Sequence, residues 1–206
     1  MPTNGLTKSY MRFILNNSIS MNREGVLMSE HIKRISRDLK FKGTILDFYQ
    51  DTMEINGDHT ATWDFISHKG ATAIVPVTKD GKILMVKQYR NALDRYTLEI
   101  PAGALDSVDE EGIDCASREL EEETGFRSEN IEWLITIRTT VAFCNERVEV
   151  FLARDLIPSK QHLDEDEFID IAAYTMDELK EKIFKGEIED GKTIASLLAY
   201  EAKFCK

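Results

Sequence analysis

The chain has 206 residues, 42% of them hydrophobic, and this composition predicts a globular protein with one substantial domain. Its 37 acidic and 26 basic residues give a net charge of −11, which argues against a broad interface with nucleic acid or an anionic membrane. The three widely spaced cysteines suggest neither a disulfide framework nor a zinc site, and no apolar run is long enough to span a membrane. We therefore expect a cytoplasmic protein.

The first 27 residues differ from the rest because they are rich in Asn, Ser and Met and show no sustained periodicity. One interpretation is a non-native leader: Arg23-Glu24-Gly25 can be encoded by a purine-rich ribosome-binding sequence just before Met28, where translation would then start. The other interpretation is an ordinary disordered tail. Either way, we expect residues 1–27 to contribute little to the folded domain.

Residues 28–68 predict an N-terminal β region. Between residues 44 and 66, short apolar segments are separated by the stretch INGDH, in which Asn56-Gly57 is a strong signal for a two-residue hairpin turn. We expect a small antiparallel sheet here, before a main domain that covers residues 69–206.

The main domain begins with ATAIVPVTKDGKILMVKQYR, in which two β-branched runs flank Asp80-Gly81 and predict a second hairpin. From about residue 109 to 124 the apolar spacing becomes helical, and Gly125 stands where a helix C-terminal glycine is expected. Three further strands are predicted by IEWLITIRTT, RVEVFLARDL and FIDIAAY.

Two helices are expected at the end of the chain. Thr175 and Glu178 form a capping box before the first, which Gly186 ends, and the second carries Leu197 and Leu198 among its apolar residues. Mixed strands with a few helices predict a layered α/β or α+β domain.

The stretch RELEEETG places four glutamates within five positions. On a helix, residues three and four apart share a face, so Glu119, Glu122 and Glu123 converge while Glu121 points elsewhere. A solvated helix face is the ordinary interpretation of such a charge run. The alternative is a metal site, because Mg²⁺ takes shared carboxylate oxygens as ligands and would offset their repulsion. Arg118, four residues before Glu122, can orient that carboxylate by a charge-assisted hydrogen bond.

The longer stretch GALDSVDEEGIDCASRELEEETGF resembles the box of the Nudix hydrolase family: a glycine, a glutamate, then Arg-Glu-apolar-any-Glu-Glu-any-Gly-apolar. The matching residues are Gly103, Glu110, Arg118, Glu119, Leu120, Glu122, Glu123, Gly125 and Phe126. One departure is the spacing from Gly103 to Glu110, which is one residue longer than is usual in the family. We expect this insertion to change the loop before the helix rather than the metal ligands.

The resemblance implies a Nudix-type α/β/α sandwich with a mixed sheet, which hydrolyses a nucleoside diphosphate linked to another group. It implies Mg²⁺ as cofactor, with Mn²⁺ as the alternative metal. The implied ligands are Glu119, Glu122 and Glu123, together with the backbone carbonyl of Ala102, and Glu122 counts among the catalytic residues.

The stretch QYR before LEIPAG resembles the ADP-ribose pyrophosphatase branch of the family, and the likeness covers residues 40–200. There, the arginine matching Arg90 contacts the diphosphate, and the glutamate matching Glu99 supports metal or substrate binding. A guanidinium binds two phosphate oxygens at once, although a surface salt bridge is the alternative role. Trp63-Asp64 resembles the Trp-Glu pair with which some ADP-sugar hydrolases bind adenine, and a buried core tryptophan is the alternative.

Two later loops also resemble this branch. In TTVAFCNER, Glu146 matches a glutamate that contacts substrate or metal, although Val141-Ala142 replaces the Pro-Gly of the branch. In LDEDEF, Glu165 and Glu167 both match glutamates proposed as the catalytic base, which would take the proton of the attacking water. The sequence does not choose between them, and solvated surface is the ordinary alternative.

These features predict metal-dependent hydrolysis of ADP-ribose or a related ADP-sugar to AMP and ribose 5-phosphate. The alternatives are Nudix hydrolysis of another nucleotide sugar or a dinucleotide, and a nucleotide-sensing module without turnover. The branch also implies a homodimer in which the N-terminal sheet crosses to the partner subunit. The four histidines, His31, His59, His68 and His162, show no metal-ligand spacing, and we expect ordinary surface or core roles for them.

Overall fold

The computed structural model describes residues 20–21, 27–28, 31–107, 109–163, 165 and 167–205. The chain divides into two compact units, Met1–Phe65 and Ile66–Lys206, which are named unit 1 and unit 2 below. The leader expected over residues 1–27 lies outside the described residues, apart from the short strand β1 (Ser20–Met21) and the first residue of β2 (Leu27–Met28), which pair antiparallel.

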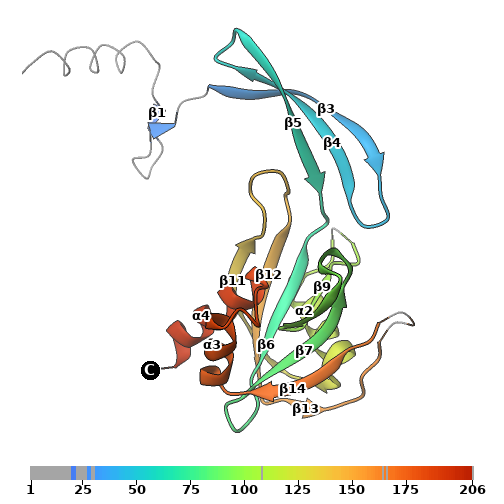
Figure 1. Ribbon diagram of the computed structural model, residues 1–206, viewed down its shortest axis with the longest axis vertical. Helices are drawn as coiled ribbons and strands as arrows, with labels where there is room; N and C mark the ends of the chain where they lie inside the picture. Colours follow the sequence, from blue (N-terminus) through green and yellow to red (C-terminus); the bar gives the residue numbers. More distant parts are fainter. Residues whose placement is uncertain are drawn as a thin grey trace, which may run out of the picture. The chain divides into compact units, whose positions relative to one another are not determined.

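Unit 1 contains a three-stranded sheet in the order β3-β4-β5 (Figure 1). Its strands are β3 (Ile32–Lys42), β4 (Asp47–Ile55) and β5 (His59–Ser67), the last of which continues into unit 2. Asn56 and Gly57 both adopt positive φ, at 55° and 79°, as a two-residue hairpin turn requires. The predicted N-terminal sheet and its turn are therefore confirmed.

Strand β3 is an addition to the predicted sheet, which was expected to begin near residue 44. It pairs antiparallel with β4, but the register shifts between Arg34 and Ser36 and again between Leu39 and Phe41. Each shift interrupts the alternation of apolar and polar residues by which a strand is predicted. The sequence of β3 therefore lacks a continuous strand pattern.

Within its described residues, unit 2 contains three sheets and three α-helices (Figure 1). The strands are β6 (Ala71–Pro76), β7 (Ile83–Arg90), β8 (Arg95–Glu99), β9 (Ala102–Ala104), β10 (Phe126–Arg127), β11 (Asn130–Arg138), β12 (Arg147–Arg154), β13 (Ile157–Pro158) and β14 (Asp170–Tyr174). The helices are α2 (Gly112–Thr124), α3 (Met176–Phe184) and α4 (Gly191–Phe204), with a short 3₁₀ helix η1 (Asn91–Leu93). The sheet orders are β11-β12-β6-β9, β14-β7-β8 and β10-β13.

The four-stranded sheet is mixed, because β12 and β6 run parallel while its other pairs are antiparallel. Successive residues of a strand point to opposite faces, so β6 directs Val75 into one apolar cluster and Ile74 into another. The first cluster includes Leu179 of α3 and Leu197 of α4, and the second includes Leu120 of α2. Helices thus cover both faces of the sheet, which confirms the predicted α/β/α sandwich.

The prediction that the strands on either side of Asp80-Gly81 pair as a hairpin is wrong. The turn is present, with Gly81 at a φ of 78°, but the strand pairing of its two sides stops at the isolated bridge between Val77 and Ile83. Strand β6 lies between β12 and β9, whereas β7 lies between β14 and β8 in another sheet. Each strand therefore has both edges paired elsewhere, and the two separate after the turn.

The predicted helix ends agree closely with the structure. The capping box of Thr175 and Glu178 is present, and Gly125 caps α2 in the left-handed conformation. Helix α2 begins three residues later than expected, because its N-cap Glu111 has extended backbone angles (φ −71°, ψ 135°). In the loop before it, the carboxylate of Glu110 accepts the backbone N–H of Asp106 at 2.6 Å. No helix within the described part of the chain has both the length and the apolar character needed to cross a membrane.

Candidate active site

Helix α2 holds two of its glutamates against strand β9. Leu120 is fully buried and so sets the rotation of the helix. A Cβ added at Gly103 would overlap the carboxylate of Glu119, so the missing side chain makes room for that carboxylate. The buried carboxylate of Glu123 accepts the backbone N–H of Ala102 at 3.0 Å. The segment PAG and the helix are therefore joined through these carboxylates.

Arg118 links the carboxylates along the helix. Its Nη1 donates to Glu119 at 2.8 Å and to Glu122 at 2.9 Å, so the predicted orientation of Glu122 by this arginine is confirmed. Its Nε lies 3.5 Å from an oxygen of Glu110, another residue of the box. The guanidinium therefore neutralises part of the negative charge on this face of α2.

Burial raises the pKa of Glu119 to about 7 and that of Glu123 to about 8. The charge of Glu119 adds to the effect at Glu123, and the nearby arginines only partly offset it. Buried carboxylates that lack a full counter-charge are suited to a divalent cation, which favours the ionised form and prefers oxygen ligands.

The donor chemistry therefore fits a divalent metal, although the present arrangement is not that of a metal site. Among the residues that the structure describes, no three His, Cys, Asp or Glu side chains are positioned to hold one ion. Glu119 and Glu122 instead hydrogen-bond to Arg118. Metal ligation by the α2 glutamates and by Ala102 stays a prediction.

The segment after β13 is fastened to the C-terminal end of α2. The hydroxyl of Ser159 donates to the carboxylate of Glu121, which confirms that Glu121 points away from the other three glutamates. The side-chain amide of Gln161 donates to the backbone carbonyl of Glu123 at 2.7 Å. The last carbonyl groups of a helix have no hydrogen-bond donor within the helix, and the segment after β13 supplies such donors.

The two candidate bases, Glu165 and Glu167, follow this anchor in the chain, and both are exposed. The negative charge of Glu167 contributes to the raised pKa of Glu119 and of Glu123. Glu167 is therefore within electrostatic reach of the α2 carboxylates. The catalytic role of either residue stays a prediction.

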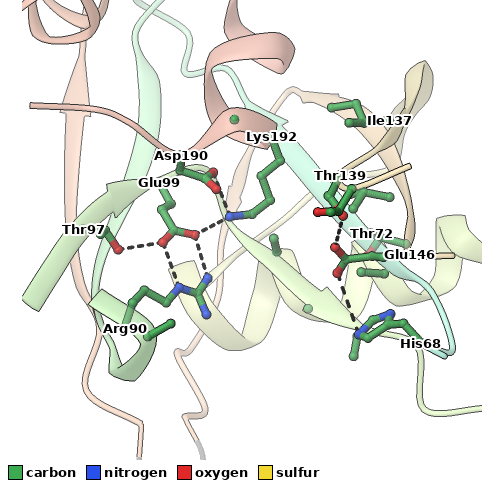
Figure 2. A pocket seen from close by; sticks show the side chains of 18 of the residues that line it. His68, Thr72, Arg90, Thr97, Glu99, Ile137, Thr139, Glu146, Asp190 and Lys192 are labelled. Carbon is green, nitrogen blue, oxygen red and sulfur yellow. Dashed lines mark hydrogen bonds and ion pairs between the residues drawn. The ribbon is translucent and has the colours of Figure 1, made fainter. Parts of the chain in front are cut away.

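A cavity of about 940 Å³ lies in unit 2 (Figure 2). Four of the predicted site residues line it, namely Arg90, Glu99, Ala102 and Glu146. Two glutamates of α2 contact the wall of the cavity. Glu123 accepts the N–H of Ala102 and the carboxylate of Glu119 lies against Gly103, and both Ala102 and Gly103 line the cavity. The cavity thus gathers residues from six strands, from the loops that join them and from the start of α4.

Glu99 is the centre of a first polar cluster on the cavity wall (Figure 2). Its carboxylate accepts two hydrogen bonds from Arg90, at 2.8 and 2.6 Å, one from Thr97 at 2.6 Å, and one from Lys192. Lys192 also donates to Asp190 at 2.9 Å. Burial alone would raise the pKa of Glu99, but these donors and positive charges outweigh it and lower the pKa to about 2. The ion pair considered as an alternative for Arg90 is therefore present, and it lies on the cavity wall.

A second polar cluster contains Glu146 (Figure 2). Its carboxylate accepts the hydroxyl of Thr139 and lies 3.8 Å from Nε2 of His68. Nδ1 of His68 accepts the backbone N–H of Gly70 at 3.0 Å, so the neutral ring carries its proton on Nε2, toward Glu146. The substrate contact predicted for Glu146 is not tested by this geometry and stays a prediction.

Two of these cavity residues were missed from the sequence. Lys192 was not a candidate, and His68 was expected to have only an ordinary role. Lys192 meets Glu99 across a separation of 93 residues, and no local pattern marks such a contact. The only available signal was the position of Lys192 in the first turn of α4, after the N-cap Asp190.

The predicted adenine-binding pair lies on β5 in unit 1. Trp63 is 44% exposed, so the alternative of a buried core tryptophan is wrong. Asp64 accepts a hydrogen bond from the side chain of Gln50 at 3.3 Å. Recognition of a base by Trp63 and Asp64 stays a prediction.

Comparison with known proteins shows the family to which this chain belongs. The family model of the NUDIX domain matches residues 67–197. A methanol dehydrogenase activator from Bacillus methanolicus is 36% identical over 167 residues, which cover 80% of this chain and 90% of that protein. An ADP-ribose pyrophosphatase from Bacillus subtilis is 36% identical over 173 residues, 83% of this chain and 93% of that protein.

A second ADP-ribose pyrophosphatase, from Mycobacterium tuberculosis, is 33% identical over 180 residues, 85% of this chain and 86% of that protein. Among solved structures, a crystal structure of an ADP compounds hydrolase shares the fold, with a TM-score of 0.75 at 16% identity over 90% of this chain and 96% of that one. The resemblance seen in RELEEETG and QYR is thereby confirmed. The chain belongs to the Nudix family and is a Nudix hydrolase, an enzyme that acts on phosphorus-containing anhydrides.

Proposed function

We propose that the protein is a metal-dependent ADP-sugar diphosphatase that hydrolyses ADP-ribose to AMP and ribose 5-phosphate. The substrate class is supported by the two relatives that are ADP-ribose pyrophosphatases. The structural observation that carries the proposal is the position of Arg90 on a cavity wall that also includes Ala102 and Gly103, the contact points of the α2 carboxylates. The diphosphate would then lie between the arginine and those carboxylates.

The cofactor in this proposal is Mg²⁺, with Mn²⁺ as the alternative. Glu119, Glu122 and Glu123 would hold it with the carbonyl of Ala102, after Glu119 and Glu122 turn away from Arg118. When bound, such a metal offsets the charge of the carboxylates and the diphosphate and lowers the pKa of water. The raised pKa values of Glu119 and Glu123 support this assignment, because these two carboxylates lack a full counter-charge.

The protein's own side chains would bind the substrate and accept the proton. Arg90 has donors beyond those given to Glu99 and would bind a phosphate oxygen. Glu167 is the favoured base of the two loop glutamates, because its charge reaches the α2 carboxylates. Glu146 would accept a hydroxyl group of the sugar.

We further propose a cytoplasmic homodimer. The three cysteines are free, as expected in a reducing compartment. Large apolar side chains are exposed on β3 of unit 1, and this pattern is typical of a surface that another chain covers. These side chains are Ile32, Ile35, Leu39 and Phe41. The molecular mass in solution, measured by light scattering, tests the dimer, and a monomeric mass would contradict it.

The experiment that tests the function is a substrate panel. The purified protein is incubated with Mg²⁺ and with ADP-ribose, other nucleotide sugars, dinucleotides and nucleoside triphosphates, and the products are separated by chromatography. We expect AMP and ribose 5-phosphate from ADP-ribose as the fastest reaction. Faster turnover of another compound would contradict ADP-ribose as the preferred substrate and favour that compound instead. No turnover of any compound would favour a nucleotide sensor.

The metal assignment is tested by Glu122→Gln. This variant should lose most turnover of ADP-ribose while its circular dichroism spectrum and melting temperature stay close to those of the unchanged protein. The carboxylate of Glu122 is 40% exposed, so its loss should not disturb the core. Near-normal activity of the variant would contradict the assignment.

A second candidate function is activation of a partner dehydrogenase. The observation in its favour is the methanol dehydrogenase activator, which is as similar to this chain as the pyrophosphatase from B. subtilis. The test is the rate of a purified bacterial methanol dehydrogenase with and without the protein, and with Glu122→Gln. An increase that Glu122→Gln abolishes would link the activation to hydrolysis, and an unchanged rate would contradict this function for the dehydrogenase tested.

A further inference from the structure

We propose that Lys192 is a second substrate-binding cation of the cavity, which binds a phosphate oxygen beside Arg90, and that Glu99 is the positioning residue for both cations. This inference rests on the proposed function, because its ligand is the diphosphate of the substrate. It adds a residue from the far end of the chain to the site predicted from the sequence.

The carboxylate of Glu99 has no free acceptor position. Two carboxylate oxygens offer about four lone-pair positions in total. Oε1 accepts from Nε of Arg90 and from the hydroxyl of Thr97, and Oε2 accepts from Nη2 of Arg90 and from Nζ of Lys192. Glu99 therefore acts on a ligand only through the two cations that it holds.

Both cations keep donors for a ligand. The ammonium of Lys192 has three N–H groups, and Glu99 and Asp190 accept two of them. The guanidinium of Arg90 has five N–H groups, and Glu99 accepts one from Nε and one from Nη2. Both side chains line the cavity, so the remaining donors are available to an anion bound there.

Glu99 would keep a counter-ion without the second cation. Glu99 already has Arg90 as a bidentate counter-ion, which is the strongest form of such a pair. The side chain of Lys192 is only 13% exposed, and removing an ammonium group from water is unfavourable. An anionic ligand in the cavity would lower that cost.

The wall beside Lys192 also leaves room for a ligand. Gly191, the first residue of α4, lines the cavity, and a Cβ added there would meet no atom within 4 Å. Figure 2 shows Lys192 and Arg90 approaching Glu99 from different elements, so the two cations flank one carboxylate. Two neighbouring oxygens of a diphosphate match such a pair of donors.

The first test is the affinity for inorganic pyrophosphate, measured by titration calorimetry with Mg²⁺ in fixed excess. Lys192→Met should weaken binding by roughly tenfold to a hundredfold, as expected for a lost hydrogen bond between charged groups. Lys192→Arg, which keeps the charge, should recover part of the affinity. The matched control is Lys185→Met, because Lys185 also pairs with a glutamate but lies at the C-terminal end of α3, as its C-cap, outside the cavity lining.

The positioning role of Glu99 is tested by a double-variant cycle with the same titration. Glu99→Gln should weaken pyrophosphate binding, and adding Lys192→Met should weaken it little further, because both changes remove the same interaction. Losses that simply add would contradict the positioning role. A loss of melting temperature without a loss of affinity would contradict it as well.

A second measurement uses the unchanged protein and so avoids any failure of a variant to fold. Acetic anhydride acetylates accessible lysines, and peptide mass spectrometry gives the rate at each one. Pyrophosphate should slow the acetylation of Lys192 and leave that of Lys185 unchanged. Equal rates at Lys192 with and without pyrophosphate, or full affinity in Lys192→Met, would overturn the proposal.

Failure of this inference can be told apart from failure of the proposed function. If the protein hydrolyses ADP-ribose and Lys192→Met retains both its KM and its affinity for pyrophosphate, only the role of Lys192 is refuted. If ADP-ribose is not hydrolysed at all, the proposed function fails, while the titration and the acetylation rates still support or overturn the anion site.

Discussion

Glu99 and Glu123 are two carboxylates of unit 2 that are buried almost equally, yet their pKa values are shifted in opposite directions. Their exposed fractions are 2% and 4%, yet the pKa of Glu99 is about 2 and that of Glu123 is about 8. Burial raises the pKa of both, so their neighbours decide the difference. Glu99 meets Arg90 and Lys192, whereas Glu123 meets one backbone N–H and the charge of another glutamate.

The contrast separates a carboxylate that supports the site from one that is available to a ligand. The acceptor positions of Glu99 are filled by donors from the protein, so it stabilises the wall of the cavity. The donors around Glu123 are too few to stabilise its ionised form, so a cation from solution would bind there favourably. We expect substitutions of Glu99 to change mainly the stability, together with the binding by its two cations, and substitutions of Glu123 to change mainly the turnover.

The largest expected effect is on turnover, in Glu123→Gln. We expect hydrolysis of ADP-ribose to fall by at least about a hundredfold, because an amide replaces a metal-binding carboxylate. The free energy of unfolding should stay within about 1 kcal/mol of the original, because an amide oxygen still accepts the N–H of Ala102 and no charge is buried. Initial rates and urea unfolding measure the two quantities.

Glu121→Gln is the matched control on the same helix, and it should keep most of the activity. The carboxylate of Glu121 bonds to Ser159 and faces away from the other three glutamates. Equal losses of turnover in the two variants would show that helix charge in general, rather than the position of Glu123, matters for the reaction.

Glu99→Gln should have the next largest effect, and mainly on stability. We expect the free energy of unfolding at pH 7 to fall by about 3 kcal/mol, because the amide leaves two cations without their shared counter-charge. Urea unfolding of unit 2, followed by circular dichroism, measures the change. A loss no greater than that of Glu123→Gln would contradict the distinction between the two carboxylates.

The pH dependence of stability sharpens the same comparison. The pKa of Glu99 is lowered to about 2 in the folded protein from an ordinary value of 4.5, so its contribution is fully present above pH 4.5. It is lost as the pH falls from there toward 2, and amounts to about 3 kcal/mol in total at 1.36 kcal/mol per pKa unit. The difference in stability between Glu99→Gln and the original should therefore shrink below pH 4.5. A difference that stays constant down to pH 3 would contradict the lowered pKa.

The two carboxylates also differ in how well they could be predicted from the sequence. Glu123 belongs to a helix whose 3.6-residue period brings Glu119, Glu122 and Arg118 together, and such local geometry is visible in a single stretch. Glu99 was assigned only by resemblance, and its partner Lys192 lies 93 residues away. Contacts of that kind depend on how the sheets and helices assemble.

In the fold, too, features that depend on neighbouring residues were predicted better than those that depend on distant contacts. The Asn56-Gly57 turn, the capping box of Thr175 and the glycine at the end of α2 depend on neighbouring residues and were predicted correctly. The strands on either side of Asp80-Gly81 were paired wrongly, because β6 and β7 find their partners in different sheets. Strand β3 falls within the predicted β region but was not identified as a strand, because two shifts of register interrupt its alternation.

The smallest expected effect is that of Gly103→Ala on stability. The added Cβ would overlap the carboxylate of Glu119, but this carboxylate is the free end of a flexible side chain and can move away from Arg118. We expect the free energy of unfolding to change by less than about 1 kcal/mol, with a clear loss of turnover because Glu119 is displaced. Urea unfolding and initial rates again measure the two.

The comparison variant is Gly125→Ala, where the added Cβ would lie 3.0 Å from the backbone nitrogen of Gln161 and the φ of 67° disfavours any side chain. Backbone cannot move aside as a side chain does, so this change should cost more stability, about 1–2 kcal/mol. If Gly103→Ala proved equally costly, the carboxylate of Glu119 would be held as firmly as that of Glu99. The α2 glutamates would then be part of the fixed framework rather than groups free to turn toward a metal.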